Sequence, residues 1–536
     1  MSAILISVIT ILIFIVGYNG YGKFLERIFR IDARCRTPAE EYYDGVDYVP
    51  AKHWSILFGH HFASIAGAGP IIGPVIATAM WGWGAGLLWI IIGTIFIGGV
   101  HDFGALVISV KNKGNSLADI SGSLINKRMK LIFSIFIWLA LLLVIAVFVY
   151  LCAQTFISEP KIVLPSLGLI PVAVLVGIML YRFRVNQIIT TLIGVGLLGI
   201  LIFAGNFFPI QLSRHGFLIW VIILFIYSYI ASITPVNILL QPRDYISSFL
   251  LIFGIIFGFL GILLTNPQIN TPVFIKFNTT LGNLWPMLFV VVACGAVSGF
   301  HSLIAAGTTS KQLSSERDAR KIGYGGMIFE GVLALLAVVC VSAGLGSHQA
   351  LLTCINTKAS GPIQAFALGF GTLTEKVFGS YGRFIATVIL NAFILTTLDT
   401  ATRIGRYITE ELTGIKNKHI ASMIIIVFSG MLALSGKWTK LWPAFGAANQ
   451  LIAALSLLII TIWIAKNGQN IKVSLIPAIF MSLTTLVALG FLFFKNLRTQ
   501  DYLLVLIAGV LIVLAIIIFI ICSITIYSYR KKGSIC

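Results

Sequence analysis

Charged side chains are the first thing this sequence has little of. Lys, Arg, Asp and Glu make up 10% of its 536 residues, whereas a soluble domain carries roughly 25%. Hydrophobic residues make up 58%, and the mean hydropathy is +1.00. Apolar runs of about 18 or more residues, the length of a membrane-spanning helix, recur along nearly the whole chain. The composition excludes a soluble protein and predicts an all-α polytopic protein of the lipid bilayer.

Motifs for enzyme chemistry are also missing. The sequence contains no GxxxxGK[ST] loop for ATP, no HExxH helix and no nucleophile elbow. Its seven cysteines are scattered without a CxxC pair, so we interpret them as packing residues and expect no resident metal. The net charge of +19 comes without a basic patch interleaved with aromatics, so nucleic acid is not an expected partner. We expect neither catalytic residues nor a cofactor.

About fifteen apolar segments are long enough to be spans. They cover about 3–21, 54–80, 85–110, 131–154, 162–181, 187–206, 216–240, 245–264, 285–306, 325–345, 382–402, 420–436, 442–465, 472–494 and 502–527. If the N-terminus lies outside, 27 of the 37 Lys and Arg residues fall in cytoplasmic segments. Positive residues concentrate on the cytoplasmic side of membrane proteins. The charges therefore predict an external N-terminus, retained as a first span, and a cytoplasmic C-terminus.

The second of these segments is interrupted. Between Gly67 and Pro74 it holds three glycines and two prolines, including Gly69, Pro70 and Gly73. Glycine loosens a helix and proline removes a backbone donor. Such backbone persists at membrane depth only where it is buried in protein or lines a cavity. This stretch is therefore a candidate binding site.

A second interruption is predicted in the span that begins near Gly216, where Pro235 lies inside the apolar run and Pro242 closes it. It lies five spans later and runs in the opposite direction. Two such breaks in inverted halves are typical of secondary transporters with a midplane site, although Pro235 alone would also fit a kinked packing helix. The predicted order is a first span and loop (1–53), a first repeat broken at 67–74 (54–206), a second repeat broken at 234–242 (207–410), and accessory helices (411–536).

Four ionisable side chains lie deep in the predicted spans. They are His60 and His61 beside the first break, Asp102 in the next span and His301 in the ninth. A charge at this depth is costly and normally faces a cavity or a partner, and imidazole titrates near neutrality. These four are candidate coupling residues; structural histidines, or a metal site of an intramembrane enzyme, are the alternatives. Thr308 and Thr309 are possible cation ligands, although hydroxyls more often bond back to the helix.

Other charges in the spans are interpreted as lying near span ends. Asp399 stands four residues before Arg403, which favours an ion pair between them. Arg243 and Asp244 are interpreted as a cytoplasmic helix boundary, and Glu330 as a side chain close enough to a span end to reach water.

The external connection 346–381 is apolar enough to dip back into the membrane as a gate. An ordinary amphipathic loop helix is the alternative.

Six long blocks of the sequence resemble the carbon starvation protein A (CstA) family of bacterial transporters. They are GHHFASIAGAGPIIGPVIA at 59–77, DFGALVISVKNKGNSLADI at 102–120, PVNILLQPRDY at 235–245, SGFHSLIAAGTTSKQL at 298–313, LDTATRIGRY at 398–407 and LWPAFGAANQLIAALSL at 441–457. The resemblance implies an inner-membrane importer of peptides, or in some members pyruvate, used when carbon is scarce and driven by a proton gradient. The family is similar in type to the amino acid–polyamine–organocation (APC) superfamily, whose leucine-transporter (LeuT-like) fold has a 5+5 inverted repeat. The sequence departs from the family pattern at His101, to which no coupling role is assigned.

These observations predict a proton-coupled peptide transporter that works by alternating access, with a pyruvate/proton symporter as the alternative and Na⁺ as an alternative coupling ion. The half-helix after the first break presents its positive N-terminal end, which suits a substrate carboxylate. The predicted substrate-binding residues are Ser64, Gly67, Gly69, Pro70, Gly73, Thr234, Pro235 and Asn237. The rival class is a channel, which would not accumulate solute, or a starvation sensor, which is expected to need a signalling output domain.

Overall fold

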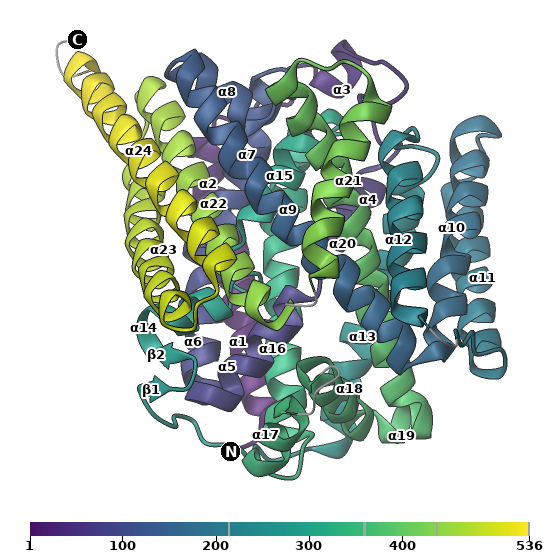
Figure 1. The fold of residues 1–536 in the computed structure, drawn as a ribbon. Helices are drawn as coiled ribbons and strands as arrows, with labels where there is room; N and C mark the ends of the chain where they lie inside the picture. The colour runs from purple at the N-terminus through teal and green to yellow at the C-terminus, as the bar shows by residue number, and fades with distance from the viewer. Residues whose placement is uncertain (213–214, 357–360, 436–437, 534–536) are drawn as a thin grey trace.

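The computed structural model describes residues 1–212, 215–356, 361–435 and 438–533. Within these ranges the chain is helical, apart from one short hairpin of β1 (Asn278–Thr279) and β2 (Gly282–Asn283). Figure 1 places the first residue and the C-terminal end of α24 (Tyr502–Gly533) at opposite ends of the helix bundle. We call these ends the N-terminal face and the C-terminal face.

Twelve helical segments of the described ranges are long and apolar enough to cross a membrane. They are α1 (Ala3–Asn19) with α2 (Tyr21–Ile28); α6 (Trp83–Gly93), η1 (Thr94–Gly98) and α7 (Gly99–Lys111); α9 (Lys127–Ser158); η2 (Pro160–Ile162), α10 (Val163–Gly177) and η3 (Ile178–Arg182); α11 (Gln187–Phe207); α12 (Gly216–Ile233); α13 (Leu240–Thr265); η5 (Glu316–Asp318), η6 (Arg320–Tyr324) and α16 (Gly325–Ala343); α19 (Glu375–Phe378), η7 (Gly379–Tyr381) and α20 (Gly382–Thr413); α22 (Trp438–Lys466); α23 (Lys472–Arg498); and α24 (Tyr502–Gly533). A thirteenth candidate is the bent pair α4 (Trp54–Ile65) and α5 (Gly69–Trp81).

The remaining helices are shorter. They are α3 (Pro38–Glu41), α8 (Leu117–Leu124), α14 (Leu284–Val291), α15 (Gly299–Gly307), η4 (Thr309–Lys311), α17 (His348–Asn356), α18 (Gly361–Leu373) and α21 (Lys418–Leu434). Of these, α21 is a shorter apolar helix that covers most of the predicted span 420–436, whose last residue lies outside the described residues. Length and composition alone thus identify about twelve spans in the described ranges, and they do not confirm the predicted fifteen.

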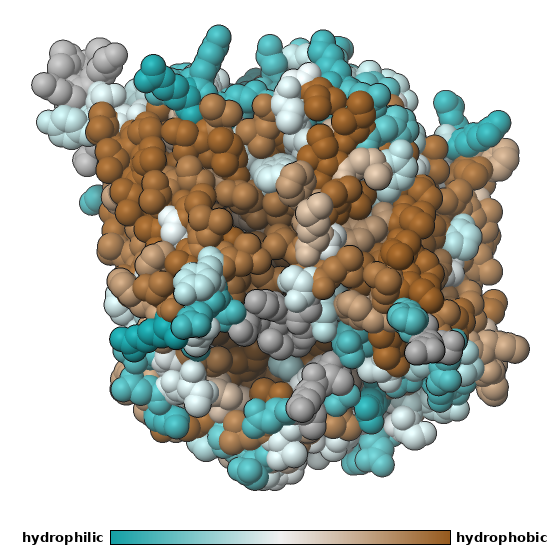
Figure 2. Space-filling model, in the orientation of Figure 1, coloured by the Kyte–Doolittle hydropathy of each residue, from teal (hydrophilic) through white to brown (hydrophobic). Residues whose placement is uncertain are grey.

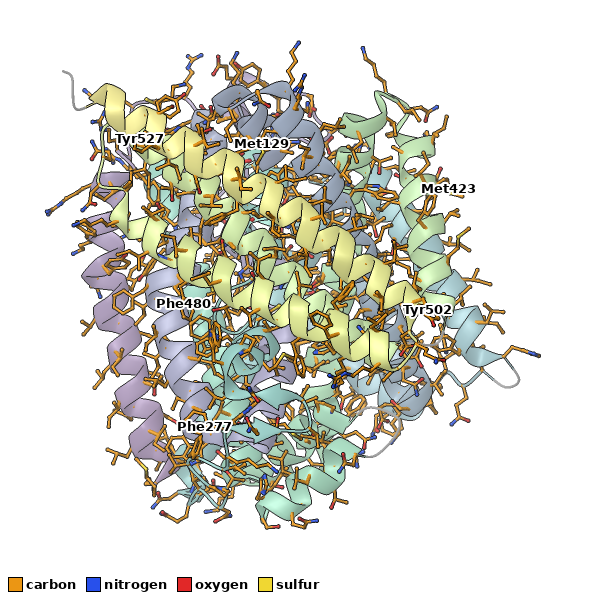
Figure 3. All side chains as sticks on the ribbon, turned by 60° about the vertical axis from the view of Figure 1, so that its left-hand side comes forward. Met129, Phe277, Met423, Phe480, Tyr502 and Tyr527 are labelled. Carbon is orange, nitrogen blue, oxygen red and sulfur yellow. The ribbon has the colours of Figure 1, made fainter. Side chains whose placement is uncertain are left out.

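The molecular surface has the pattern of a protein embedded in lipid. Figure 2 shows a broad apolar belt around the middle and hydrophilic side chains at both ends. Large apolar side chains such as Leu12, Phe203 and Met431 are exposed within the bundle's flanks. In Figure 3, α24 crosses the outside of the bundle from Tyr502 to Tyr527, and α23, which carries Phe480, lies beside it. These helices pack on α22 and extend the wall that faces the bilayer.

The predicted first break is present. α4 ends at Ile65, α5 begins at Gly69, and their axes differ by 43°. Pro70 stands at the start of α5, where its missing N–H would have no partner in the helix. The Gly/Pro pattern therefore locates this interruption correctly.

The predicted second break at 234–242 is wrong. α12 ends at Ile233 and α13 begins at Leu240, so Pro235 lies in a connection between two spans. A residue before proline avoids the helical region, and Thr234 is extended, with φ −75° and ψ 142°. Pro242 occupies the first turn of α13, where a backbone donor is not needed. Both prolines therefore mark helix ends.

A different span is interrupted instead. The predicted span 285–306 divides into α14 and α15, and residues 292–298 between them are not helical. The intervening sequence VACGAVS has small side chains and no proline. Its backbone is accommodated because neighbouring helices bond to it: the Val292 carbonyl accepts from Trp89 Nε1 at 3.3 Å, and the Phe300 N–H donates to Asn449 Oδ1 at 2.8 Å.

The connection 346–381 forms α17, α18 and α19, and residues 357–360 of the predicted gate lie outside the described residues. α18 packs on α5, α16 and α20. Its Gly369 lies so close to α16 that a β-carbon there would be 2.1 Å from the Cys340 carbonyl oxygen. The segment is therefore packed into the N-terminal end of the bundle.

We predict that Gly299→Ala destabilises the fold. A β-carbon at Gly299 would lie 2.1 Å from the backbone oxygen of Asn449, so α15 and α22 would have to move apart. Such overpacking costs about 1–3 kcal/mol. The thermal midpoint of the purified protein in detergent should fall. Gly490→Ala in α23 is the control, because no heavy atom lies within 4 Å of its added β-carbon. Equal midpoints for the two variants would contradict the close approach.

Candidate functional site

The two interrupted helices meet at their breaks. A β-carbon on Gly69 would lie 2.4 Å from Cys294 Sγ, and one on Gly73 would lie 2.5 Å from the Val291 carbonyl oxygen. A β-carbon on Gly295 would lie 3.4 Å from Pro70 Cα, an ordinary contact that places the second break beside the start of α5. Only residues without a side chain allow the two backbones to come this close. The glycines predicted to bind substrate therefore also fix the contact between the breaks.

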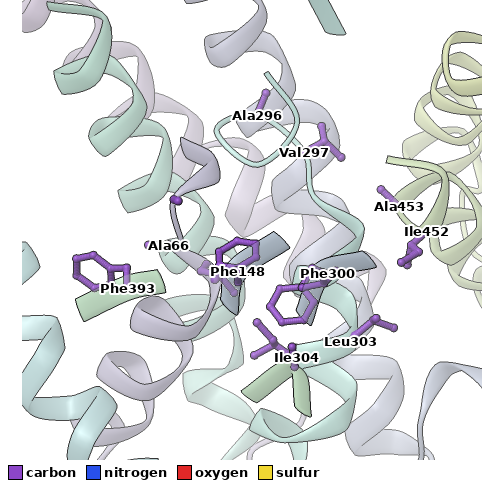
Figure 4. Close-up of a cluster of buried hydrophobic side chains, with 14 of the residues drawn as sticks. Ala66, Phe148, Ala296, Val297, Phe300, Leu303, Ile304, Phe393, Ile452 and Ala453 are labelled. Atoms are coloured by element: carbon purple, nitrogen blue, oxygen red, sulfur yellow. The ribbon is translucent and has the colours of Figure 1, made fainter. Parts of the chain in front are cut away.

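Apolar side chains enclose the breaks. Figure 4 shows Ala66 at the first break, Ala296 and Val297 at the second, and the rings of Phe148 and Phe300 beside them. Phe148 of α9 lies 3.1 Å from the position of a β-carbon on Gly67. Because apolar side chains offer no hydrogen bonds, the free backbone groups need other protein partners.

A cavity of about 310 Å³ ends at the two breaks. Gly69 and Cys294 both line it, together with the aromatic residues Trp442 and Phe445. Asn356 and Lys495 supply polar groups, and other parts of the wall come from the β1–β2 turn and α18. These elements lie at the N-terminal face in Figure 1, and Figure 2 shows a hollow in the lower part of the surface. Its size matches that of a small-molecule site.

Asp102 lies in a chain of buried ionisable groups. Its Oδ1 is 2.7 Å from His101 Nδ1, and its Oδ2 is 2.9 Å from His301 Nδ1. His301 Nε2 in turn lies 3.2 Å from Glu330 Oε2. We call these four residues the Asp102 cluster; each is at most 1% exposed. The cluster joins α7, α15 and α16. The prediction that Glu330 reaches water is therefore wrong.

His61 and Thr309 bond to each other, with 2.9 Å between Nδ1 and Oγ1. Thr308 Oγ1 donates to the Ile304 carbonyl at 3.0 Å, the backbone interaction that competes with cation binding. Within the described ranges, no three or more His, Cys, Asp or Glu side chains are placed to hold a metal ion. A cation site at Thr308 and Thr309 stays a prediction without geometric support.

His60 belongs to a second buried network. Asp244 Oδ2 accepts from Ser64 Oγ at 3.0 Å and lies 2.7 Å from His60 Nδ1, and its Oδ1 accepts from Arg243 Nε at 3.0 Å. Arg243 also pairs with Asp399 and with the Tyr227 hydroxyl. We call His60, Tyr227, Arg243, Asp244 and Asp399 the Arg243 cluster. It ties the first broken helix to α12, α13 and α20.

Arg243 and Asp244 lie near the start of α13, as predicted for a helix boundary, but they are fully buried, and α13 packs on α4 and α20. The expectation for Asp399 is wrong. Asp399 does not pair with Arg403, since Asp399 faces Arg243 on the interior side. Arg403 instead bonds Asp47, with 2.7 Å between Nη1 and Oδ1.

Asp47 of the loop before α4 joins three side chains of α20. Besides Arg403, its carboxylate accepts from Tyr407 at 2.6 Å and lies 3.4 Å from Arg406. Burial opposes ionisation of Asp47, but the charges of Arg403, Arg406 and Lys311 outweigh it and lower the pKa to about 2. We call Asp47, Arg403, Arg406 and Tyr407 the Asp47 latch.

The substrate-binding residues predicted at 234–237 lie at this latch and not at the cavity. The Thr234 carbonyl accepts from Arg403, and the Val236 N–H donates to the Val46 carbonyl at 3.0 Å. Thr397, which contacts Gly67, precedes Arg403 by six residues on α20, a rise of about 9 Å. Thr234, Pro235 and Asn237 are therefore separated from Gly67, Gly69, Pro70 and Gly73. Ser64 lies with the Arg243 cluster.

Sequence reasoning missed several residues of the site. Cys294 and Asn449 frame the second break, while Glu330, Asp244 and Asp47 complete the charged clusters. Glu330 and Asn449 carried a signal, namely a polar side chain inside an apolar run. Asp47 carried none, because its partners follow it by more than 350 positions.

The fold and site define a polytopic α-helical membrane protein with a ligand-sized cavity between two interrupted helices, an arrangement typical of secondary transporters. The chain belongs to the carbon starvation protein CstA family, whose sequence model matches residues 2–353 and 346–488.

Similar proteins include two from bacteria with curated names. The chain is 30% identical to "Peptide transporter CstA" of Campylobacter jejuni, over 90% of this chain and 79% of that protein. It is also 30% identical to "Pyruvate/proton symporter BtsT" of Escherichia coli, over 92% and 82%. A solved structure of an Eremococcus coleocola manganese transporter is similar in fold, with a TM-score of 0.55, 12% identity, and coverage of 91% of this chain and 99% of that one.

We predict that Arg243→Met strongly destabilises the protein. The change leaves Asp244 and Asp399 buried without their cationic partner, and breaking a buried pair in this way costs about 3–5 kcal/mol. Thermal unfolding in detergent should show a much lower midpoint. Arg34→Met is the control, because the Arg34–Asp32 pair is exposed and its loss should change little. A midpoint for Arg243→Met equal to the control's would show that the buried network does not hold the helices.

Proposed function

We propose that this protein is a secondary active transporter that imports peptides by alternating access. The observation that carries the proposal is the cavity that runs from the N-terminal face to the contact between two interrupted helices. A channel would need a continuous path, whereas the Asp47 latch and the loop around it cover the C-terminal side in this structure. The named activities of the relatives support a transporter and not a sensor.

The helix contacts support a LeuT-like inverted repeat with revised membership. The first broken helix packs on α13 and α16, and the second packs on α22 and α7. In the same way, α12 contacts both α9 and α20, and α21 contacts both α20 and α9. In an inverted repeat, each helix of one half corresponds to a helix of the other half. The contacts above follow this correspondence if the first half is α4/α5, α6–α7, α9, α12 and α13, and the second half is α14/α15, α16, α20, α21 and α22. The halves are then 54–265 and 284–466, and not 54–206 and 207–410.

In this arrangement α10–α11 and α17–α19 are insertions. With α1, α10, α11, α23 and α24 added to the ten repeat helices, the chain has fifteen spans. The excess of Lys and Arg at the C-terminal face supports an external N-terminal face and a cytoplasmic C-terminus in the bacterial inner membrane.

The cavity suits a substrate with apolar side chains and a carboxylate. Its wall is mainly apolar, while α5 begins at Gly69, so the positive end of that half-helix meets the cavity. Lys495 adds a cation to the wall. Pyruvate, the substrate in one relative's name, offers the carboxylate but would leave most of about 310 Å³ unfilled, which favours a peptide.

We propose the proton as the coupling ion and the buried His and carboxylate clusters as its site. His301 and Asp102 connect the second break to α7, and His60 and Asp244 connect the first break to α13. Adding or removing a proton in either cluster changes the force between a broken helix and its neighbour. His61 lies between the two clusters, next to His60.

Uptake into proteoliposomes tests the function. The wild-type protein should accumulate labelled dipeptide when the external side is acidic, with labelled pyruvate as the competing candidate. Asp102→Asn should abolish accumulation, because the carboxylate that pairs with His301 is lost. Absence of gradient-dependent accumulation of either compound would contradict the transporter proposal. Normal accumulation by Asp102→Asn would remove Asp102 from coupling.

The Asp47 latch should close the C-terminal face. Asp47→Asn removes the charge that holds Arg403 and Arg406, so a cysteine introduced at Thr400 should react several-fold faster with an impermeant thiol reagent applied from that face. Asp32→Asn, in the same loop but exposed, is the control.

The pH dependence of the latch has a definite sign. With a pKa of about 2 instead of 3.8, Asp47 stabilises closure at all pH values above about 4 and loses this effect as the pH falls toward 2. Between pH 5 and 8 the latch should therefore not titrate. If the rate of thiol labelling at position 400 rises between pH 5 and 8 with Asp47 present, but not in Asp47→Asn, the expectation that the latch does not titrate in this range is contradicted.

A further inference from the structure

Unpaired polar atoms gather around Glu330. Within the described residues, the buried atoms without a hydrogen-bond partner include both carboxylate oxygens of Glu330 and the Nε2 atoms of His61, His101 and His301. A buried polar group without a partner is costly, and a cluster of them calls for an explanation. The cluster lies where α4, α7, α15 and α16 meet.

The hydrogen-bond pattern requires one proton between His301 and Glu330. Asp102 Oδ2 lies 2.9 Å from His301 Nδ1, so an ionised Asp102 makes Nδ1 the nitrogen that carries hydrogen. In a neutral imidazole the other nitrogen, Nε2, then has only a lone pair, which faces Glu330 Oε2 at 3.2 Å. Two acceptors at this distance repel. The contact is favourable only if Glu330 is protonated or if His301 is an imidazolium.

Charge balance leads to the same conclusion. With His101 and His301 neutral and Asp102 ionised, the cluster carries one negative charge while Glu330 holds its proton and two when it does not. Moving the proton from Glu330 to His301 leaves the net charge of the cluster unchanged. The presence of this shared proton, and not its position, therefore keeps the buried charge at minus one. Releasing it leaves two carboxylates in an interior that water does not reach.

The neighbours of Glu330 make this proton sensitive to the state of both breaks. His61 of the first broken helix lies 3.0 Å from the position of a β-carbon on Gly326, one turn before Glu330 in α16. Cys294 in the second break is the other titratable group near the carboxylate. Phe14 and Thr94, which pack beside the adjoining Gly331, carry no charge.

We propose that Glu330 and His301 together bind the coupling proton, with Asp102 as the residue that sets the hydrogen position on His301. This inference rests on the proposed transport function. His301 lies in the first turn of α15, where a positive charge is disfavoured by the helix dipole. Proton release leaves charged carboxylates on α7 (Asp102) and α16 (Glu330) and removes the hydrogen shared by His301 and Glu330, whereas proton binding restores that bond and draws α15 and α16 together. The second break moves with α15.

Glu330→Gln tests the proposal. Glutamine keeps the size of the side chain and can donate to His301 Nε2, but it cannot release a proton. Accumulation driven by a pH gradient should fall to the level measured without a gradient, while counterflow exchange should continue and lose its pH dependence. Glu375→Gln, an exposed change at the N-terminal face, is the matched control and should behave as the wild type. Accumulation by Glu330→Gln equal to that of the control would overturn the proposal.

A second measurement applies if Glu330→Gln folds but no longer exchanges substrate. Substrate binding in weakly buffered solution should take up about one proton in the wild type and in Glu330→Asp, which keeps an ionisable group, and none in Glu330→Gln. Equal proton uptake by wild type and Glu330→Gln would overturn the inference. If the wild type itself accumulates neither dipeptide nor pyruvate, the proposed function fails instead, so the two failures are distinguishable.

Discussion

The close contact between two interrupted helices is the constraint on which the rest of the structure depends. Gly73 lets the backbones of α5 and α14 approach at Val291 without a side chain between them, and Gly69 leaves room for the side chain of Cys294 in the second break. The freed carbonyls and N–H groups need partners because lipid offers none at this depth. Thr396, Trp89 and Asn449 supply these bonds from the helices around the breaks. The same contact forms the floor of the cavity, so fold and candidate binding site share one set of residues.

Two clusters of buried charges hold the broken helices against their neighbours. The Arg243 cluster fastens α4 to α13 and α20, and its arginine balances carboxylates from two helices. The Asp102 cluster has no arginine and lies on the other side of the breaks, against α7 and α16. A network with a permanent cation suits a fixed attachment, because arginine does not lose its proton. A network of histidines and carboxylates suits a change of charge, which is why, of the two clusters proposed for coupling, the Asp102 cluster is the one to which binding of the coupling proton is assigned.

Local sequence chemistry was enough to predict the helical membrane fold and an interruption near Gly67, because glycine and proline weaken a regular helix; the break itself covers 66–68, and α5 resumes at Gly69. It failed at Pro235, where a proline that ends a helix was interpreted as one that interrupts it. The break at 292–298 has no proline and exists because Trp89 and Asn449 bond its backbone, which is a property of the tertiary structure. Asp102 and His301 were correctly expected to be buried, but their partner Glu330 was placed near water. Partners far apart in the chain, such as Asp47 of the loop before α4 and Arg403 of α20, left no signal in the order of residues.

The thiol of Cys294 offers the most direct test of the central claim, that substrate binds where the two breaks meet. This residue lines the cavity and contacts Gly69. In a variant that keeps Cys294 and replaces the other six cysteines, an impermeant thiol reagent applied at the N-terminal face should react with it. A saturating amount of the transported substrate should slow that reaction several-fold. A reaction rate unchanged by substrate would contradict the account, as would reaction only from the C-terminal face.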